Sequence, residues 1–124
     1  DSVAWAYDYL LPRLKVVRRV RSAVVHPVCA THHLGLSKKI HALAAALSEE
    51  AVTPIYSTCC AFAGDRGMLH PELTNSATSE QVEEIKDRQF DAYIASNRTC
   101  EIGMNLVTGK DYRSVIFLLE ELTR

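Results

Sequence analysis

Residues 22–47 read SAVVHPVCATHHLGLSKKIHALAAAL, and this stretch decides the fold that we expect. Its first four residues, up to Val25, form a short run typical of a buried strand. Thr31 offers a helix cap after that run. One apolar helical face then follows, formed by Leu36, Ile40, Leu43, Ala44 and Leu47. The stretch therefore predicts a strand, a loop and a helix in that order.

The same order returns twice further along the chain. Residues 52–56 read as a second strand and residues 57–71 as a loop that contains glycine. The buried side of the next helix is predicted from Leu73, Ala77, Val82 and Ile85. Residues 91–95 read as a third strand and residues 96–109 as a loop with a short helix. A closing helix, capped near Asp111, has the buried stripe Val115, Leu118, Leu119 and Leu122.

Repeated strand-to-helix units predict a parallel sheet, because parallel neighbours need crossover connections, and such crossovers are right-handed. We therefore expect one α/β domain over residues 1–124, a three-layer, Rossmann-like fold with helices on both faces of the sheet. The loops that leave the carboxyl ends of the strands then lie on one edge, where ligands bind in such folds.

The four cysteines, Cys29, Cys59, Cys60 and Cys100, fall in these loops, so the predicted topology brings them to one edge. Soft thiolate ligands from separate loops suit an iron–sulfur cluster, a zinc ion or a redox-active dithiol. Two alternatives stay open: separately buried small hydrophobic residues, and a pair of disulfides. A domain of this size can bury a core without disulfides, and adjacent cysteines are an awkward start for a disulfide framework.

Histidines near the cysteines are candidate auxiliary ligands, since imidazole can replace thiolate on iron or zinc. We place His32 and His33 first, in the opening turn of the helix that begins near Cys29. His26 and His70 come next.

Arg66 and Arg98 lie close in sequence to the paired cysteines and to Cys100. Either cation could lower the pKa of a thiol or raise the potential of a cluster electrostatically. The alternative for each is a structural ion pair, with Asp65 or with Glu101.

The net charge of the chain bears on which partners it binds. A formal net charge of −1 argues against broad attraction to nucleic acid or to an anionic membrane. No apolar run approaches the ~20 residues that span a bilayer, and no signal segment is present, so we expect a cytoplasmic domain, or one peripheral to the inner membrane on that side.

The amino-terminal segment predicts a helix over residues 2–11, which Pro12 ends, and an edge strand over residues 15–20. A chain that starts at Asp1, without an initiator Met, leads us to expect a piece of a longer protein.

Three segments resemble the cysteine-rich CCG domain: His-Pro-Val-Cys at 26–29, Cys-Cys-Ala-Phe-Ala-Gly-Asp-Arg-Gly at 59–67, and Ser-Asn-Arg-Thr-Cys-Glu-Ile-Gly at 96–103. They look most like the version at the carboxyl end of FAD-linked D-lactate dehydrogenases and related glycolate-oxidase-type iron–sulfur oxidoreductases. The likeness extends from about His26 to Arg124. Two departures stand out: Ala61 follows the paired cysteines where the family has Gly, and Gly103 stands where a fifth cysteine would end the motif.

This resemblance implies a carboxyl-terminal module that follows an FAD-binding region and a ferredoxin-like segment in the parent chain. The FAD region oxidises the 2-hydroxy acid, so the isolated module is not itself catalytic. We expect Cys29, Cys59, Cys60 and Cys100 to bind an iron–sulfur cluster, a four-iron cubane, which an isolated domain exposed to oxygen easily loses. The upstream domains are the expected partners, and the sequence does not fix the electron acceptor.

Two other functions stay open at this stage. The missing fifth cysteine favours a metal-free or zinc-bound domain that docks the same enzyme onto a partner. Thiol–disulfide chemistry among the cysteines is a third possibility, and it needs a thiolate of low pKa.

Overall fold

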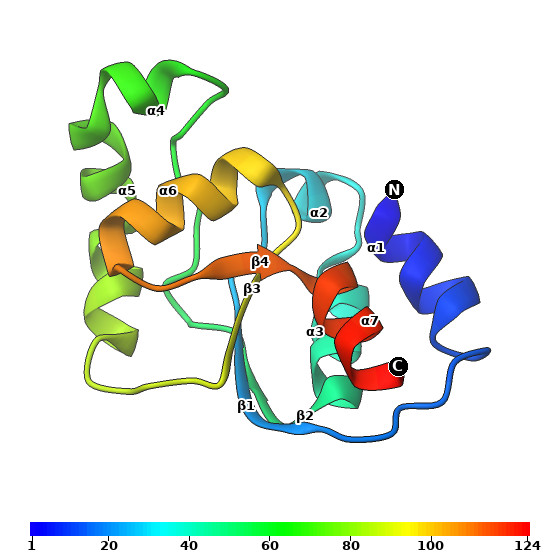
Figure 1. Cartoon of the computed structure of the whole chain (residues 1–124). Helices are drawn as coiled ribbons and strands as arrows, with labels where there is room; N and C mark the ends of the chain where they lie inside the picture. The colour runs from blue at the N-terminus through cyan, green and yellow to red at the C-terminus, as the bar shows by residue number, and fades with distance from the viewer.

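The computed structural model, which describes all 124 residues, contains one four-stranded sheet in which every neighbouring pair of strands is parallel (Figure 1). The strands are β1 (Val20–Val25), β2 (Ser48–Val52), β3 (Ala92–Ala95) and β4 (Tyr112–Ser114). Their order across the sheet is β2-β1-β3-β4. The chain thus moves outward from β1 to β2, crosses back to β3 and continues outward to β4, so its direction reverses between β1 and β3.

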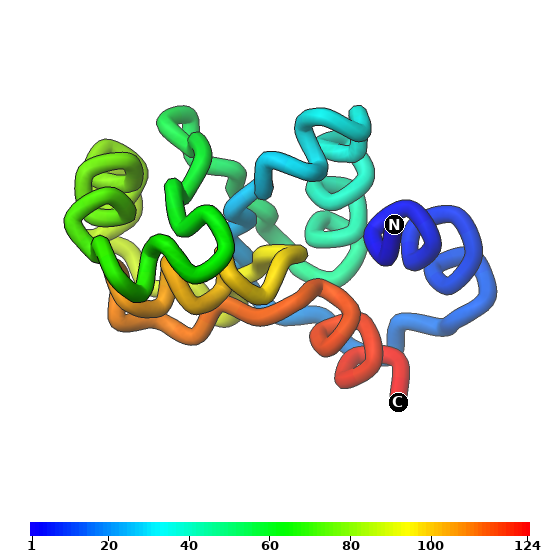
Figure 2. Tube along the Cα trace, turned by 90° about the horizontal axis from the view of Figure 1, so that it is seen from above, coloured from blue at the N-terminus to red at the C-terminus, as the bar shows by residue number.

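Helices cover both faces of this sheet, as the two separate groups in Figure 2 show. One group holds α1 (Ser2–Trp5) with its π-helical continuation η1 (Ala6–Leu10), α3 (Ser37–Leu47) and α7 (Val115–Thr123). The other holds α4 (Arg66–Leu69), α5 (Pro71–Ile85) and α6 (Arg98–Thr108), while the short α2 (Cys29–His33) follows β1 at the sheet edge. None of the helices has the length and apolar composition that crossing a bilayer requires.

The sheet separates two hydrophobic cores. Alternate side chains of β1 point to opposite faces: Ala23 and Val25 join the core under α3 and α7, whereas Val24 joins the core under α5 and α6. This second core also contains Cys60 and Cys100. Two of the cysteines are therefore part of the packed interior.

The three-layer, parallel-sheet architecture predicted from the sequence is confirmed. The strand and helix predicted within residues 22–47 are present as β1 and α3, and α3 buries Ile40, Leu43, Ala44 and Leu47 as expected. The strand over residues 91–95 is β3. The regular spacing of their apolar residues made these elements predictable from the sequence.

Several boundaries differ from the prediction. The second strand is Ser48–Val52 rather than residues 52–56, because the chain passes directly from α3 into the sheet and turns near Pro54. Residues 15–19 form no strand, and only Val20 of that run joins β1. Thr31 lies inside α2, where its hydroxyl donates to the carbonyl of Val28 at 2.7 Å, instead of capping the helix.

The carboxyl-terminal third contains more regular structure than predicted. Most of residues 96–109 form α6, whose amino end is capped by the side chain of Asn97. A fourth strand, β4, follows, and Ser114 rather than Asp111 caps α7. The buried face of α5 also differs, since it consists of Thr74, Thr78, Gln81 and Ile85.

The first core sets the stability of the sheet face opposite the cysteines, so it can be tested separately from them. Leu43 is fully buried in α3. Leu43→Ala should lower the free energy of unfolding by about 2–5 kcal/mol, because it leaves a cavity. Leu106→Ala on the exposed side of α6 should change it by less than about 0.5 kcal/mol. Chemical denaturation measures both, and equal effects would contradict the assigned burial.

Candidate metal centre

The candidate site lies where the direction of the chain reverses, at the carboxyl ends of β1 and β3. Strand β1 leads into His26, whose backbone N–H donates to the carbonyl of Ile94 in β3 at 2.8 Å. The connections from β1 and β3 then leave toward opposite faces, α3 on one side and α6 on the other. Open parallel sheets bind ligands at this kind of switch point.

All four cysteines lie at this edge, as predicted. Cys29 begins α2 and is half-buried, while Cys100 lies in the first turn of α6 and is buried. The adjacent cysteines lie in the long loop after β2, with Cys59 exposed and Cys60 buried. Their assignment as ligands stays a prediction, but the sheet brings them into one neighbourhood.

The cysteines form two contacting pairs. The Sγ atoms of Cys60 and Cys100 lie 3.3 Å apart inside the second core. Cys29 contacts Cys59 closer to the surface. His26 lies beside the inner pair, because its ring nitrogen and the Sγ atoms of Cys60 and Cys100 are all within 4.8 Å of one another. These three side chains form a compact, fully enclosed donor group.

The inner pair shares one proton unequally. The hydrogen bond between Cys60 and Cys100 is the largest cause of the strongly lowered pKa of Cys60. Burial opposes this effect, and the imidazole of His26 and the backbone N–H of Phe62 reinforce it. The same contact, together with burial, strongly raises the pKa of Cys100. Of the two sulfurs, Cys60 is therefore the one on which negative charge is favoured.

The outer pair consists of Cys29 and Cys59, and here the pKa of Cys29 is raised. The contact with Cys59 raises the pKa of Cys29 to about 11, and burial adds to that shift. At neutral pH the metal-free Cys29 is therefore a thiol. A metal that binds it must displace this proton, so metal affinity should increase with pH.

A left-handed turn follows the paired cysteines. Ala61 and Ala63 have φ values of 55° and 48°, and the backbone N–H of Ala61 donates to Cys59 Sγ at 3.3 Å. The first value explains why the family motif has Gly at this position, since only Gly adopts such a φ without steric cost. The turn redirects the chain so that Phe62, next in sequence, enters the core.

Phe62 packs beside Gly103, the position where the family resemblance implies a fifth cysteine. Its ring is fully buried between two glycines. A Cβ atom at Gly67 would overlap the ring, and a Cβ atom at Gly103 would lie 3.0 Å from Phe62 Cδ2. A side chain at position 103 would therefore compete with Phe62 for the same space.

No hydrogen bond joins a predicted auxiliary residue to a sulfur atom, and their role stays a prediction. His32 and His33 are exposed on α2, and His32 Nδ1 lies 3.2 Å from Ser37 Oγ. Arg66 is exposed at the start of α4. Arg98 forms an ion pair with Glu101 at 2.8 Å, which is the structural alternative considered above.

Sequence reasoning ranked His26 below His32 and His33, and it missed Gln81 entirely. Gln81 is fully buried on α5, and its Oε1 lies 3.1 Å from His26 Nδ1. The signal for Gln81 is a polar side chain on the buried face of a helix, which only the three-dimensional packing reveals.

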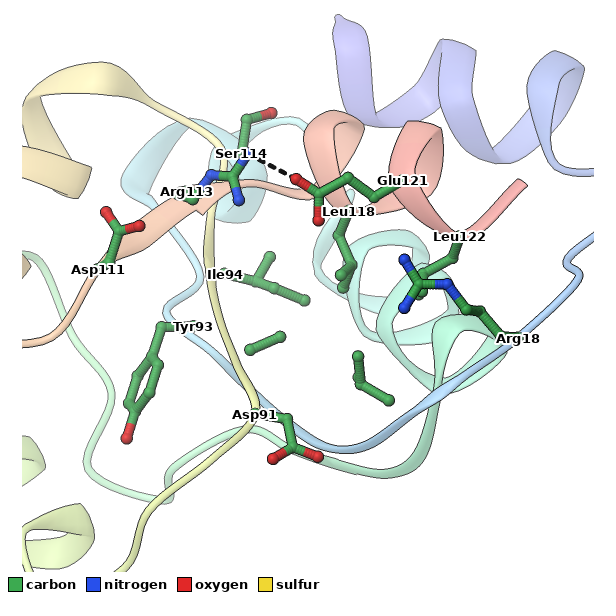
Figure 3. A pocket seen from close by; sticks show the side chains of 12 residues that line it. Arg18, Asp91, Tyr93, Ile94, Asp111, Arg113, Ser114, Leu118, Glu121 and Leu122 are labelled. Carbon is green, nitrogen blue, oxygen red and sulfur yellow. Dashed lines mark hydrogen bonds and ion pairs between the residues drawn. The ribbon is translucent and has the colours of Figure 1, made fainter. Parts of the chain in front are cut away.

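A separate pocket of about 290 Å³ lies between β3, β4 and α7, and none of its lining residues is a cysteine (Figure 3). Its apolar residues include Ile94 and Leu122, and charged side chains surround them. Arg113 on its rim is paired with Glu121 at 2.9 Å. The pocket is thus a feature of the first core, apart from the sulfur site.

Comparison with known proteins identifies the family of this domain. A model of the cysteine-rich domain family called CCG matches residues 23–105, a segment that contains His26 and all four cysteines. A search of curated proteins and a search of solved structures each found no match.

The turn after the paired cysteines yields a test in which two similar substitutions have opposite effects. Ala61→Gly should raise the free energy of unfolding by about 1 kcal/mol, because it removes the cost of a left-handed alanine. Ala45→Gly, at an exposed position within α3, should lower it by about 1 kcal/mol. Urea denaturation of both variants measures the difference, and a destabilised Ala61→Gly would contradict the assigned backbone.

Proposed function

The chain belongs to the family of cysteine-rich CCG domains, and from this membership we propose that it is an electron-transfer module whose Cys29, Cys59, Cys60 and Cys100 bind an iron–sulfur cluster. The observation that carries the proposal is the meeting of four free thiols at one sheet edge. Four thiolates are the usual ligand set of such a cluster. When bound, the cluster supplies one-electron transfer.

The surroundings of the thiols support this role. The inner pair lies in a packed apolar core with Phe62 and Met104, which excludes water from one side of the centre. Cys59 reaches the surface on the other side. Burial and access to solvent tune the potential of a cluster, so this asymmetry suits a site that is held inside and exchanges electrons at its exposed edge.

We assign the module to the carboxyl end of an FAD-linked D-lactate dehydrogenase or a related 2-hydroxy-acid oxidoreductase. The support is the resemblance of residues 59–67 and 96–103 to that version of the domain. In this assignment the flavin and the substrate belong to the upstream FAD domain. Electrons reach the module through a ferredoxin-like domain, and both domains are its partners.

A zinc-bound docking domain is the second candidate, and one observation favours it. The donor atoms of His26, Cys60 and Cys100 lie within 4.8 Å of one another. Ligands of one tetrahedral zinc ion lie about 3.4–3.8 Å apart, as bond lengths near 2.0–2.3 Å require. The inner group is thus compact enough for a single ion.

Metal analysis after anaerobic reconstitution separates the two candidates. The chain should retain about four iron and four acid-labile sulfide and should accept one electron from a chemical reductant. Cys60→Ser and Cys100→Ser should each bind at least tenfold less iron than the unmodified chain, because each substitution removes a buried thiolate. Ser79→Ala, on the exposed side of α5, should retain it and serves as the control.

Zinc bound at one equivalent, without sulfide and without a reducible signal, would contradict electron transfer and favour the docking domain. Circular dichroism of each variant shows whether a loss of metal reflects a lost ligand or a lost fold.

A further inference from the structure

His26 is held in a fixed position at the centre of the candidate site. Its side chain is fully buried, and its backbone N–H donates a hydrogen bond to the carbonyl of Ile94 in β3. On the far side of the ring, Nδ1 lies 3.1 Å from Gln81 Oε1. An amide oxygen can only accept, so Nδ1 carries the donated hydrogen, and Nε2 is the nitrogen that remains for another ligand.

Nε2 has no hydrogen-bond partner although it is buried. A buried polar atom without a partner costs about 1–3 kcal/mol. A structural histidine in a core normally satisfies both nitrogens, whereas this one leaves Nε2 unpaired while a nitrogen of its ring lies within 4.8 Å of the Sγ atoms of Cys60 and Cys100. A metal ion is the partner that fits a free imidazole nitrogen beside two sulfurs.

The remaining histidines do not share this arrangement. All four are exposed, and three of them place Nδ1 near a surface oxygen: His32 near Ser37, His41 near Thr53 and His70 near Glu72. His26 differs from them because its Nε2 atom is buried and has no hydrogen-bond partner.

The helix that holds Gln81 carries polar residues on its buried side. The buried face of α5 carries Thr74, Thr78 and Gln81 where apolar residues would stabilise the core. Thr74 Oγ1 and Gln81 Nε2 also lack partners. Ligating histidines usually donate their second nitrogen to an oxygen that fixes the ring, and Gln81 occupies that position.

We propose that His26 binds the metal centre through Nε2 as a nitrogen ligand, and that Gln81 is the positioning residue that orients its ring. This inference rests on the proposed metal-binding function and adds a donor outside the four cysteines. It gives the chain five donors although position 103 is glycine. The mixed set of nitrogen and sulfur distinguishes this site from one built of thiolates alone.

Pulsed electron paramagnetic resonance on the anaerobically reconstituted, reduced chain tests the ligand directly. Labelling histidine with ¹⁵N should change a strong nitrogen coupling to the metal. His26→Cys should retain the metal and lose this coupling, because a thiolate replaces the imidazole. His70→Ala, at an exposed histidine, should leave the coupling unchanged.

Titration of the metal-free chain with Co²⁺ tests the role of Gln81. Gln81→Leu should weaken Co²⁺ binding about 10–100-fold, the usual cost of losing such an orienting bond, and should alter the nitrogen coupling of the reconstituted chain. Gln81→Glu keeps an oxygen acceptor and should restore most of the affinity. Equal effects of the two substitutions would overturn the positioning role.

The outcomes separate the inference from the proposed function. A reconstituted centre that shows thiolate ligation but no histidine coupling would overturn the role of His26 and leave the metal centre intact. A chain that binds neither iron nor Co²⁺ would overturn both. The same denaturation midpoint for His26→Cys and the unmodified metal-free chain excludes misfolding as the cause of a lost coupling.

Discussion

The reversal of chain direction between β1 and β3 is the constraint on which the candidate site depends. Because the connections after these two strands leave toward opposite faces, no helix closes the space at their carboxyl ends. The bond from His26 to Ile94 holds the two strand ends together at the base of this space. The loop after β2 reaches it from outside and delivers Cys60 to Cys100, 40 residues later in sequence. A different strand order would separate the sulfur atoms of Cys60 and Cys100 even if the sequence around each cysteine stayed the same.

The second core contains buried polar atoms that lower its stability. Buried atoms of His26, Thr74, Gln81 and Tyr112 have no hydrogen-bond partner, and each such atom costs about 1–3 kcal/mol. The first core, on the other face, is almost purely aliphatic and has no such atoms. The difference between the two faces follows from their tasks. One face packs aliphatic side chains, and the other also buries the polar side chains of His26 and Gln81.

The sequence predicts the fold well where local periodicity and tertiary burial agree, and poorly where they do not. Strand β1 and helix α3 were predictable because every buried position is apolar. Helix α6 was not, because Gly103 and polar residues interrupt its pattern, and β4 has only three residues. The meeting of the cysteines followed from topology alone. The placement of His26 did not, because its partner Gln81 lies 55 positions away on a helix whose buried face was predicted correctly only at Ile85.

The departures of this chain from its family motif belong to one packing arrangement. Ala61 in the left-handed region turns the chain, Phe62 enters the core, and Gly67 and Gly103 leave room for its ring. A Cβ atom at position 103 would lie in tight contact with this ring, so glycine there suits the buried Phe62. Nitrogen ligation by His26 has an electrostatic consequence in this setting. A neutral imidazole adds no negative charge where a fifth thiolate would add one, and less negative charge around an iron–sulfur centre raises its reduction potential, as imidazole ligands do in Rieske centres. In the proposed iron–sulfur centre, ligation by His26 would thus favour acceptance of an electron more than a set of thiolates alone would.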